Sequence, residues 1–199
     1  MTEAQKILLQ QKKAQVKHTQ ELKSWLPYWL PVFNAVLALR RPWSFEYFDC
    51  VKQPYFPICE AAIQQFLIGT YIPITAIIKI PDNYYVHDKM KALFPSSLLL
   101  RYMPALTTHV AWETDSALML SQAAKTLTIP SEEEVYFFYT RFTPVLRLPF
   151  SSIGLLREEE IMNPEDLCIM ALDGSWLIFR SLENEWTWGY KQPDFKTTL

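Results

Sequence analysis

The chain has 199 residues, half of them apolar, and its 19 basic and 21 acidic residues leave a formal net charge of −2. A chain of this length can bury one sizeable core, and its balanced charge provides no basic stripe of the kind that nucleic-acid binding requires. Only 4 glycines are present, and they form neither a GxGxxG motif nor a P-loop, which excludes the common nucleotide-binding sites.

The cysteines and the N-terminus indicate a cytoplasmic protein. Cys50, Cys59 and Cys168 are odd in number and lie in apolar sequence, which favours buried, reduced thiols over a disulfide framework. The first 20 residues also lack the apolar run and the small-residue cleavage site of a secretory signal.

Residues 2–24 are rich in Gln and Lys and contain no Gly or Pro, which favours a mostly exposed helix or a tail that folds against a partner. The apolar run over residues 24–39 is too short to span a bilayer and contains prolines, so we expect no stable membrane insertion. We predict a buried helix starting near Pro31. The aromatic patch before it, with Trp25 and Trp29, is predicted to pack on the core or on another protein.

Strands and helices alternate through the next part of the chain. Aromatic and β-branched runs predict the strands, and apolar residues at helical spacing predict the helices. The predicted elements are strands over residues 43–50, 71–80, 98–103 and 109–112, and helices over residues 59–67, 88–94 and 117–127. Thr114 or Asp115 is expected to cap the last helix, and Pro130 to end it.

The most informative stretch is EVYFFYTRFTPVLRLPF, residues 134–150. Ser131 and Glu134 have the spacing of a capping box, and the apolar residues that follow recur at helical spacing, which favours a helix. However, residues 135–142 are nearly all aromatic or β-branched, and Pro144 comes soon after them. We therefore predict a strand that ends in a proline corner.

The C-terminal part is predicted to be an antiparallel meander. Asp173-Gly174 between two apolar runs, residues 167–172 and 175–180, is a strong hairpin signal. Residues 185–190 are expected to add a third strand. Before the hairpin, the charge run over residues 157–160 is interpreted as a solvated face, and a short helix is predicted to start at residues 163–166.

These elements predict a mixed α/β (α+β) fold with a central mixed sheet, flanking helices and a C-terminal antiparallel hairpin or meander. Residues 1–42 are interpreted as an N-terminal helical and aromatic extension. Residues 43–199 are expected to form a single α/β domain.

No catalytic, metal or cofactor site is predicted. Zinc sites need clustered Cys and His, which are scattered along this chain, and the nearest approach, Asp82, His87 and Asp88, is interpreted as a polar turn. A cysteine nucleophile would need a histidine base nearby in space, and no local signature supports one. We therefore expect a protein that is not an enzyme.

The aromatic content is unusual, with 7 Trp, 10 Tyr and 12 Phe. Five of the tryptophans lie towards the two ends of the chain, where aromatic residues often serve as interface anchors: Trp25, Trp29, Trp43, Trp186 and Trp188. This pattern favours a module that binds another protein.

The residues Arg141-Phe142-Thr143-Pro144-Val145-Leu146 resemble a motif of the bacterial type VI secretion adaptor chaperones, the Tap-like family. That motif, Arg-aromatic-aromatic-Asp-Pro-Arg-Val-Leu, ends an aromatic strand. The upstream order is also similar to the family's, and the resemblance covers residues 43–150. The segments that carry it are WSFEYFDCVKQP, LLLRYMPAL, HVAW, SALMLSQAAKTL and EVYFFYTRF.

The resemblance implies a non-catalytic cytoplasmic adaptor that binds a toxic effector and helps to load it onto the secretion spike protein. The partner-binding surface would then include, or be supported by, Trp25, Trp29, Arg141, Phe142 and Pro144. Arg141 can pair with a carboxylate, while Phe142 and Pro144 form a rigid apolar corner. The same corner can equally serve only to join a core strand to the next segment.

A second interaction hypothesis is an immunity or antitoxin-like protein that neutralises a toxin by occluding it. The acidic runs and the aromatic residues suit this hypothesis equally well.

Overall fold

The computed structural model describes residues 2–47, 64, 85–106, 110–140, 144–161 and 165–191. The side chains of residues 18, 19, 21–27, 47 and 110 lie outside this description. So do the strand predicted over residues 71–80, the helix predicted over residues 59–67 except for residue 64, and the thiols of Cys50 and Cys59.

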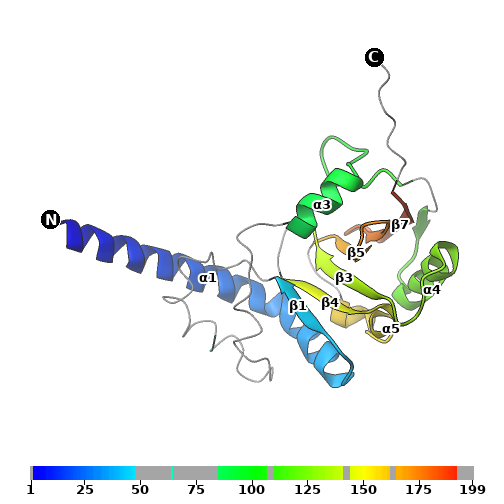
Figure 1. Cartoon of the computed structure of the whole chain (residues 1–199), viewed down its shortest axis with the longest axis horizontal. Helices are drawn as coiled ribbons and strands as arrows, with labels where there is room; N and C mark the ends of the chain where they lie inside the picture. The colour runs from blue at the N-terminus through cyan, green and yellow to red at the C-terminus, as the bar shows by residue number, and fades with distance from the viewer. Residues whose placement is uncertain are drawn as a thin grey trace, which may run out of the picture.

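The described strands form one seven-stranded sheet in the order β1-β4-β3-β5-β6-β7-β2 (Figure 1). The strands are β1 (Ser44–Tyr47), β2 (Val110–Trp112), β3 (Glu134–Tyr139), β4 (Val145–Pro149), β5 (Leu167–Ala171), β6 (Trp176–Arg180) and β7 (Glu185–Tyr190). With the helices described below, they confirm a mixed α+β fold. Every described strand pair is antiparallel, so the expected mixture of parallel and antiparallel strands is not present among them.

Strand β3 is an interior strand of this sheet, between β4 and β5, and confirms the strand interpretation of the EVYFFY run. It pairs with β4 through Val135–Leu148 and with β5 through Phe138–Cys168. Residues 135–139 are all buried, because aromatic and β-branched side chains pack on both faces of a covered sheet. The helical spacing of the same residues has no structural counterpart.

Helices cover both faces of β3. On one face, α3 (Tyr85–Leu93) places His87 against the Phe138 ring, with centroids 5.0 Å apart. On the other face, α1 (Glu3–Ala38) places Trp29 edge-on to Tyr139 at 5.2 Å. Two short helices, α5 (Phe150–Ile153) and α6 (Glu158–Ile161), follow β4, and the Tyr139 hydroxyl donates to the Ile161 carbonyl.

Helix α1 corrects the prediction of a separate helix starting near Pro31. It begins with a capping box at Thr2 and Gln5 and runs for 36 residues through Pro27 and Pro31. A proline inside a helix costs about 3 kcal/mol or more, because it removes one backbone hydrogen bond and clashes with the preceding turn. The buried stripe of Trp29, Val32, Phe33 and Val36 offsets that cost.

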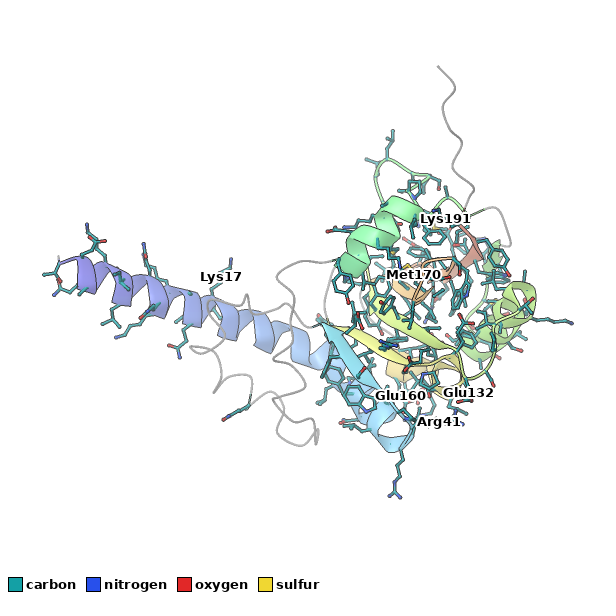
Figure 2. The ribbon with its side chains drawn as sticks, viewed as in Figure 1. Lys17, Arg41, Glu132, Glu160, Met170 and Lys191 are labelled. Carbon is teal, nitrogen blue, oxygen red and sulfur yellow. The ribbon has the colours of Figure 1, made fainter. Side chains whose placement is uncertain are left out.

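The first half of α1 reaches away from the sheet, whereas its second half packs against it (Figure 1). Lys17 lies on the projecting half and Met170 within the body (Figure 2). The helix predicted over residues 2–24 is thus confirmed, and the part of α1 from Trp29 to Val36 belongs to the core. Within the described residues, no helix is both long enough and apolar enough to cross a membrane.

Several local signals are confirmed. Asp115 caps α4 (Ser116–Leu127) by accepting the Leu118 N–H at 3.0 Å, and Thr128 ends the helix in the left-handed conformation before Pro130. The Asp173-Gly174 hairpin joins β5 to β6, with Gly174 at φ 81°. This positive φ is one that residues other than glycine rarely adopt, so the turn favours glycine.

Two local predictions are wrong. Residues 98–103 form a loop instead of a strand, with one isolated bridge between Ser96 and Pro104. Glu165 and Asp166 lie outside any helix, and β5 begins directly after them. In both places short-range propensity competes with tertiary context, which decides the outcome.

The burial of Trp29 gives a direct test of how α1 is attached. Replacing Trp29, which is 1% exposed, by Ala should lower the free energy of unfolding by about 3–5 kcal/mol, because it leaves a large cavity against Tyr139. Tyr28→Ala is the matched control, since Tyr28 is the preceding residue of the same helix and is 47% exposed. Equal effects of the two substitutions in urea denaturation would contradict this packing.

Candidate protein-interaction site

The structure separates the five predicted partner-binding residues. Trp29 is buried, so its ring is not available on the surface. Of the two predictions for this residue, packing on the core is confirmed. Pro144 is buried immediately before β4. Arg141 and Phe142 lie outside the described residues, as does the side chain of Trp25.

The other terminal tryptophans are not exposed interface anchors either. Trp186 and Trp188 are buried on β7, and Trp43 packs at 5.3 Å against Phe45 at the edge of the core. Strands β6 and β7 bury both of their faces, which leaves no solvent side for these rings. The large aromatic content therefore serves mainly the core in the described part of the chain.

The most exposed apolar group on the described surface is a run of three leucines. Leu99 and Leu100 are fully exposed, at 104% and 101%, and Leu98 is 45% exposed. They lie in the segment that joins α3 to β2, which we call the leucine loop (residues 95–104). Single exposed leucines are common on protein surfaces, but consecutive leucines at a loop tip point to an interaction site.

Serine side chains and backbone bonds close the base of the leucine loop. The Ser97 N–H donates to the Met103 carbonyl at 2.7 Å, and the Ala105 N–H donates to the Pro95 carbonyl at 2.8 Å. The Ser96 hydroxyl lies 2.9 Å from the Leu98 carbonyl and accepts the Met103 N–H at 3.1 Å. These bonds hold the tip in one shape, which lowers the entropic cost of binding.

Two side chains after the leucines attach the loop to the body. Tyr102 packs edge-on to Phe179 of β6 with ring centroids 5.9 Å apart, and its hydroxyl donates to the Phe94 carbonyl. Arg101 donates to Glu183 and Glu185, both at 2.6 Å, and Glu185 is a buried residue. The loop is therefore fixed to the β6–β7 turn, with its apolar tip in solvent.

A cleft of about 260 Å³ lies beside the loop. Arg101, Tyr102 and Leu182 line it together with Lys91, Thr140, Glu165, Asp166 and Glu183. Thr140 is the residue that directly precedes the predicted motif in the sequence. Acidic side chains outnumber basic ones on its walls, which favours a partner with basic side chains.

The charge run over residues 157–160 is not simply a solvated face. Glu158 accepts from Arg180 and from Ser116, and Arg180 is buried on β6 with its guanidinium 5.5 Å from the Trp186 ring centroid. Arg180 also donates to Asn184 at 2.6 Å. This network ties α6, α4 and the β6–β7 turn together, and its role is structural.

The titratable side chains of Cys168, Tyr139 and His87 are buried in the core. Burial raises the pKa of the Cys168 thiol well above its usual value, and that thiol lies 3.3 Å from Met90 Sδ. Burial also raises the pKa of the Tyr139 hydroxyl. His87 is a buried core residue whose Nε2 lies 2.9 Å from the Tyr139 carbonyl, which corrects its interpretation as part of a polar turn.

The described part of the chain contains no cluster of side chains that could bind a metal ion. Within those residues, no three His, Cys, Asp or Glu side chains lie together in a way that could hold an ion.

Comparison with protein-family models, with curated proteins and with solved structures finds no match.

Sequence reasoning missed the leucine loop because LLLRYM has the composition of a strand. The signals that identify it are the Pro95-Ser96-Ser97 turn residues before the leucines and Pro104 after them. The ion pairs of Arg101 join residues about 80 positions apart. No short-range pattern predicts such contacts.

Arg101 provides a test of the loop's attachment. Arg101→Met should lower the free energy of unfolding by about 1–3 kcal/mol, because it leaves the buried Glu185 carboxylate without its cation. Limited proteolysis should also cut faster within residues 96–104. Arg157→Met, which breaks only exposed pairs with Glu159 and Glu160, should change stability much less.

The burial of Cys168 gives a test of its reactivity. Its raised pKa keeps the thiol protonated at neutral pH, so iodoacetamide should label Cys168 slowly in the folded protein and rapidly in urea. Peptide mapping by mass spectrometry distinguishes it from Cys50 and Cys59. Rapid native labelling of Cys168 would reopen the hypothesis of a nucleophilic cysteine.

Proposed function

We propose that this chain is a non-catalytic protein-binding module that uses the leucine loop as its main contact. The observation that supports this most strongly is the full exposure of Leu99 and Leu100 on a loop held by Arg101 and Ser96. Holding two leucines in water is unfavourable, and a partner that covers them recovers about 1.5–3 kcal/mol for each fully buried side chain.

The specific form of the proposal is a cytoplasmic adaptor chaperone of type VI secretion, which holds a toxic effector and helps to load it onto the spike protein. It rests on the sequence resemblance over residues 43–150. The leucine loop supports it because LLLRYMPAL is one of the similar segments, and its leucines are those that the structure exposes. Thr140, which lines the cleft beside the loop, directly precedes the Arg141 motif in the sequence.

An immunity protein that occludes a toxin is the second candidate. The acidic residues around the leucine loop favour it, because a basic toxin surface would be electrostatically complementary to Glu165, Asp166 and Glu183. The two candidates differ in the number of partners. An adaptor binds cargo and spike, whereas an immunity protein needs only its toxin.

Co-expression with the products of the neighbouring reading frames tests the proposal. The wild-type chain should co-purify with one of them, and Leu99→Ser with Leu100→Ser should reduce capture at least about tenfold, as expected for interface anchors. Leu155→Ser is the matched control, because Leu155 is also an exposed leucine, at 53%, but lies after α5.

The adaptor requires that deletion of the chain stops secretion of the effector and that a spike protein joins the complex. Protection of a toxin-producing cell with no spike present would favour the immunity protein instead. If the double leucine variant captures every neighbouring product as well as the wild type does, the leucine loop is not the contact.

A further inference from the structure

The projecting half of α1 is a second surface that the protein-binding proposal does not use. We define the arm as residues 3–20 of α1. Its large apolar side chains remain exposed, between 44% and 57%: Ile7, Leu8, Leu9 and Val16. Most helix stability in proteins comes from packing of an apolar face, so exposed apolar side chains on a projecting arm favour a partner that covers them.

Basic residues border one apolar seam of the arm. Leu9 and Val16 are seven residues apart and therefore lie on the same side of the helix. Lys13 and Lys6 flank this seam on one side, and Lys12 flanks it on the other. The arm thus presents a narrow apolar stripe between lysines, which fits an apolar ridge in acidic surroundings.

The leucine loop has this complementary character. Its tip is Leu98–Leu99–Leu100, and the charged side chains that line the adjoining cleft are three acids, Glu165, Asp166 and Glu183, against Lys91 and Arg101. The balance of basic and acidic residues also differs between the N-terminal segment and the rest of the chain. Residues 1–24 hold five lysines and two glutamates, whereas the remaining residues hold 14 basic and 19 acidic side chains.

We propose that the arm of one copy covers the leucine loop of a second copy, and the reverse, in a reciprocal dimer. Leu9 and Val16 would pack on the leucine tip while the flanking lysines approach the acidic rim. The arm is about 27 Å long, enough to lie across the loop and its cleft. Reciprocity supplies two such contacts, as a two-fold dimer requires.

In this dimer, the arm of the second copy covers the leucine loop until a partner protein binds. In this respect the inference deepens the proposed function, because the partner would displace the arm from the loop. The dimer itself does not depend on that function. Its test uses the chain alone, so it can fail while the protein-binding proposal holds, and the reverse.

Complementation between two variants is the decisive experiment. The arm variant carries Leu9→Ser and Val16→Ser, and the loop variant carries Leu99→Ser and Leu100→Ser. Each should weaken self-association at least about tenfold, because every arm–loop contact then has one damaged side. In a mixed dimer of the two variants, one contact is damaged on both sides and the other is intact.

We therefore expect light scattering to show dimers of the wild type, of about twice 23.4 kDa, that dissociate as salt is raised. Each variant alone should be monomeric at the same concentration, and their equimolar mixture should form heterodimers. Ile7→Ser, on the opposite face of the arm, and Leu155→Ser should dimerise as the wild type does. Circular dichroism should show unchanged helix content in every variant.

A wild-type chain that stays monomeric at all concentrations would overturn the proposal. So would a mixture of the two variants that associates no better than either variant alone. Sedimentation of the monomeric chain on phosphatidylserine vesicles, lost in Lys12→Glu with Lys13→Glu, would assign the arm to an anionic lipid surface and also overturn it.

Discussion

Strand β3 directs Phe138 to α3 and Tyr139 to Trp29 of α1, so one buried run of aromatic residues joins both helical layers to the sheet. Hydrogen bonding to β4 on one side and β5 on the other leaves this strand no exposed edge. The long helix depends on this contact, because the buried stripe from Trp29 to Val36 offsets the cost of its two internal prolines. The remaining strands extend the sheet outward from β3.

The leucine loop is attached to the same core through strands β5 and β6. Phe179 of β6 lies opposite Cys168 of β5, which in turn lies opposite Phe138 of β3, and Tyr102 packs on Phe179. Arg101 then pairs with two glutamates at the β6–β7 turn. An exposed apolar tip is thus carried on a rigid base, the arrangement in which binding costs least conformational entropy. The arm of α1 is the opposite case, because its exposed apolar side chains lie on a part of the helix that projects from the packed body.

The core was more accessible to sequence reasoning than the surface. The EVYFFY strand, the Asp115 cap and the Asp173-Gly174 hairpin follow from composition and turn chemistry, which act over a few residues. The exposed leucines could not be told from a buried strand, since periodicity does not state what covers a side chain. The burial of Trp29, and with it the passage of α1 through Pro31, depends on contacts with residues more than a hundred positions away. The pairing of Arg180 with Glu158 is hidden for the same reason, so a structural network looked like a solvated charge run.

The central claim is that Leu99 and Leu100 lie at the surface where another protein binds. Hydroxyl-radical footprinting of the complex purified from co-expression tests it directly, because leucine oxidation reports side-chain exposure. It is best done in the arm variant, in which a second copy does not cover the loop. The account predicts that Leu99 and Leu100 are oxidised readily in the free chain and lose most of that oxidation in the complex, while Leu155 keeps its own. Unchanged oxidation of Leu99 and Leu100 in the complex would contradict it.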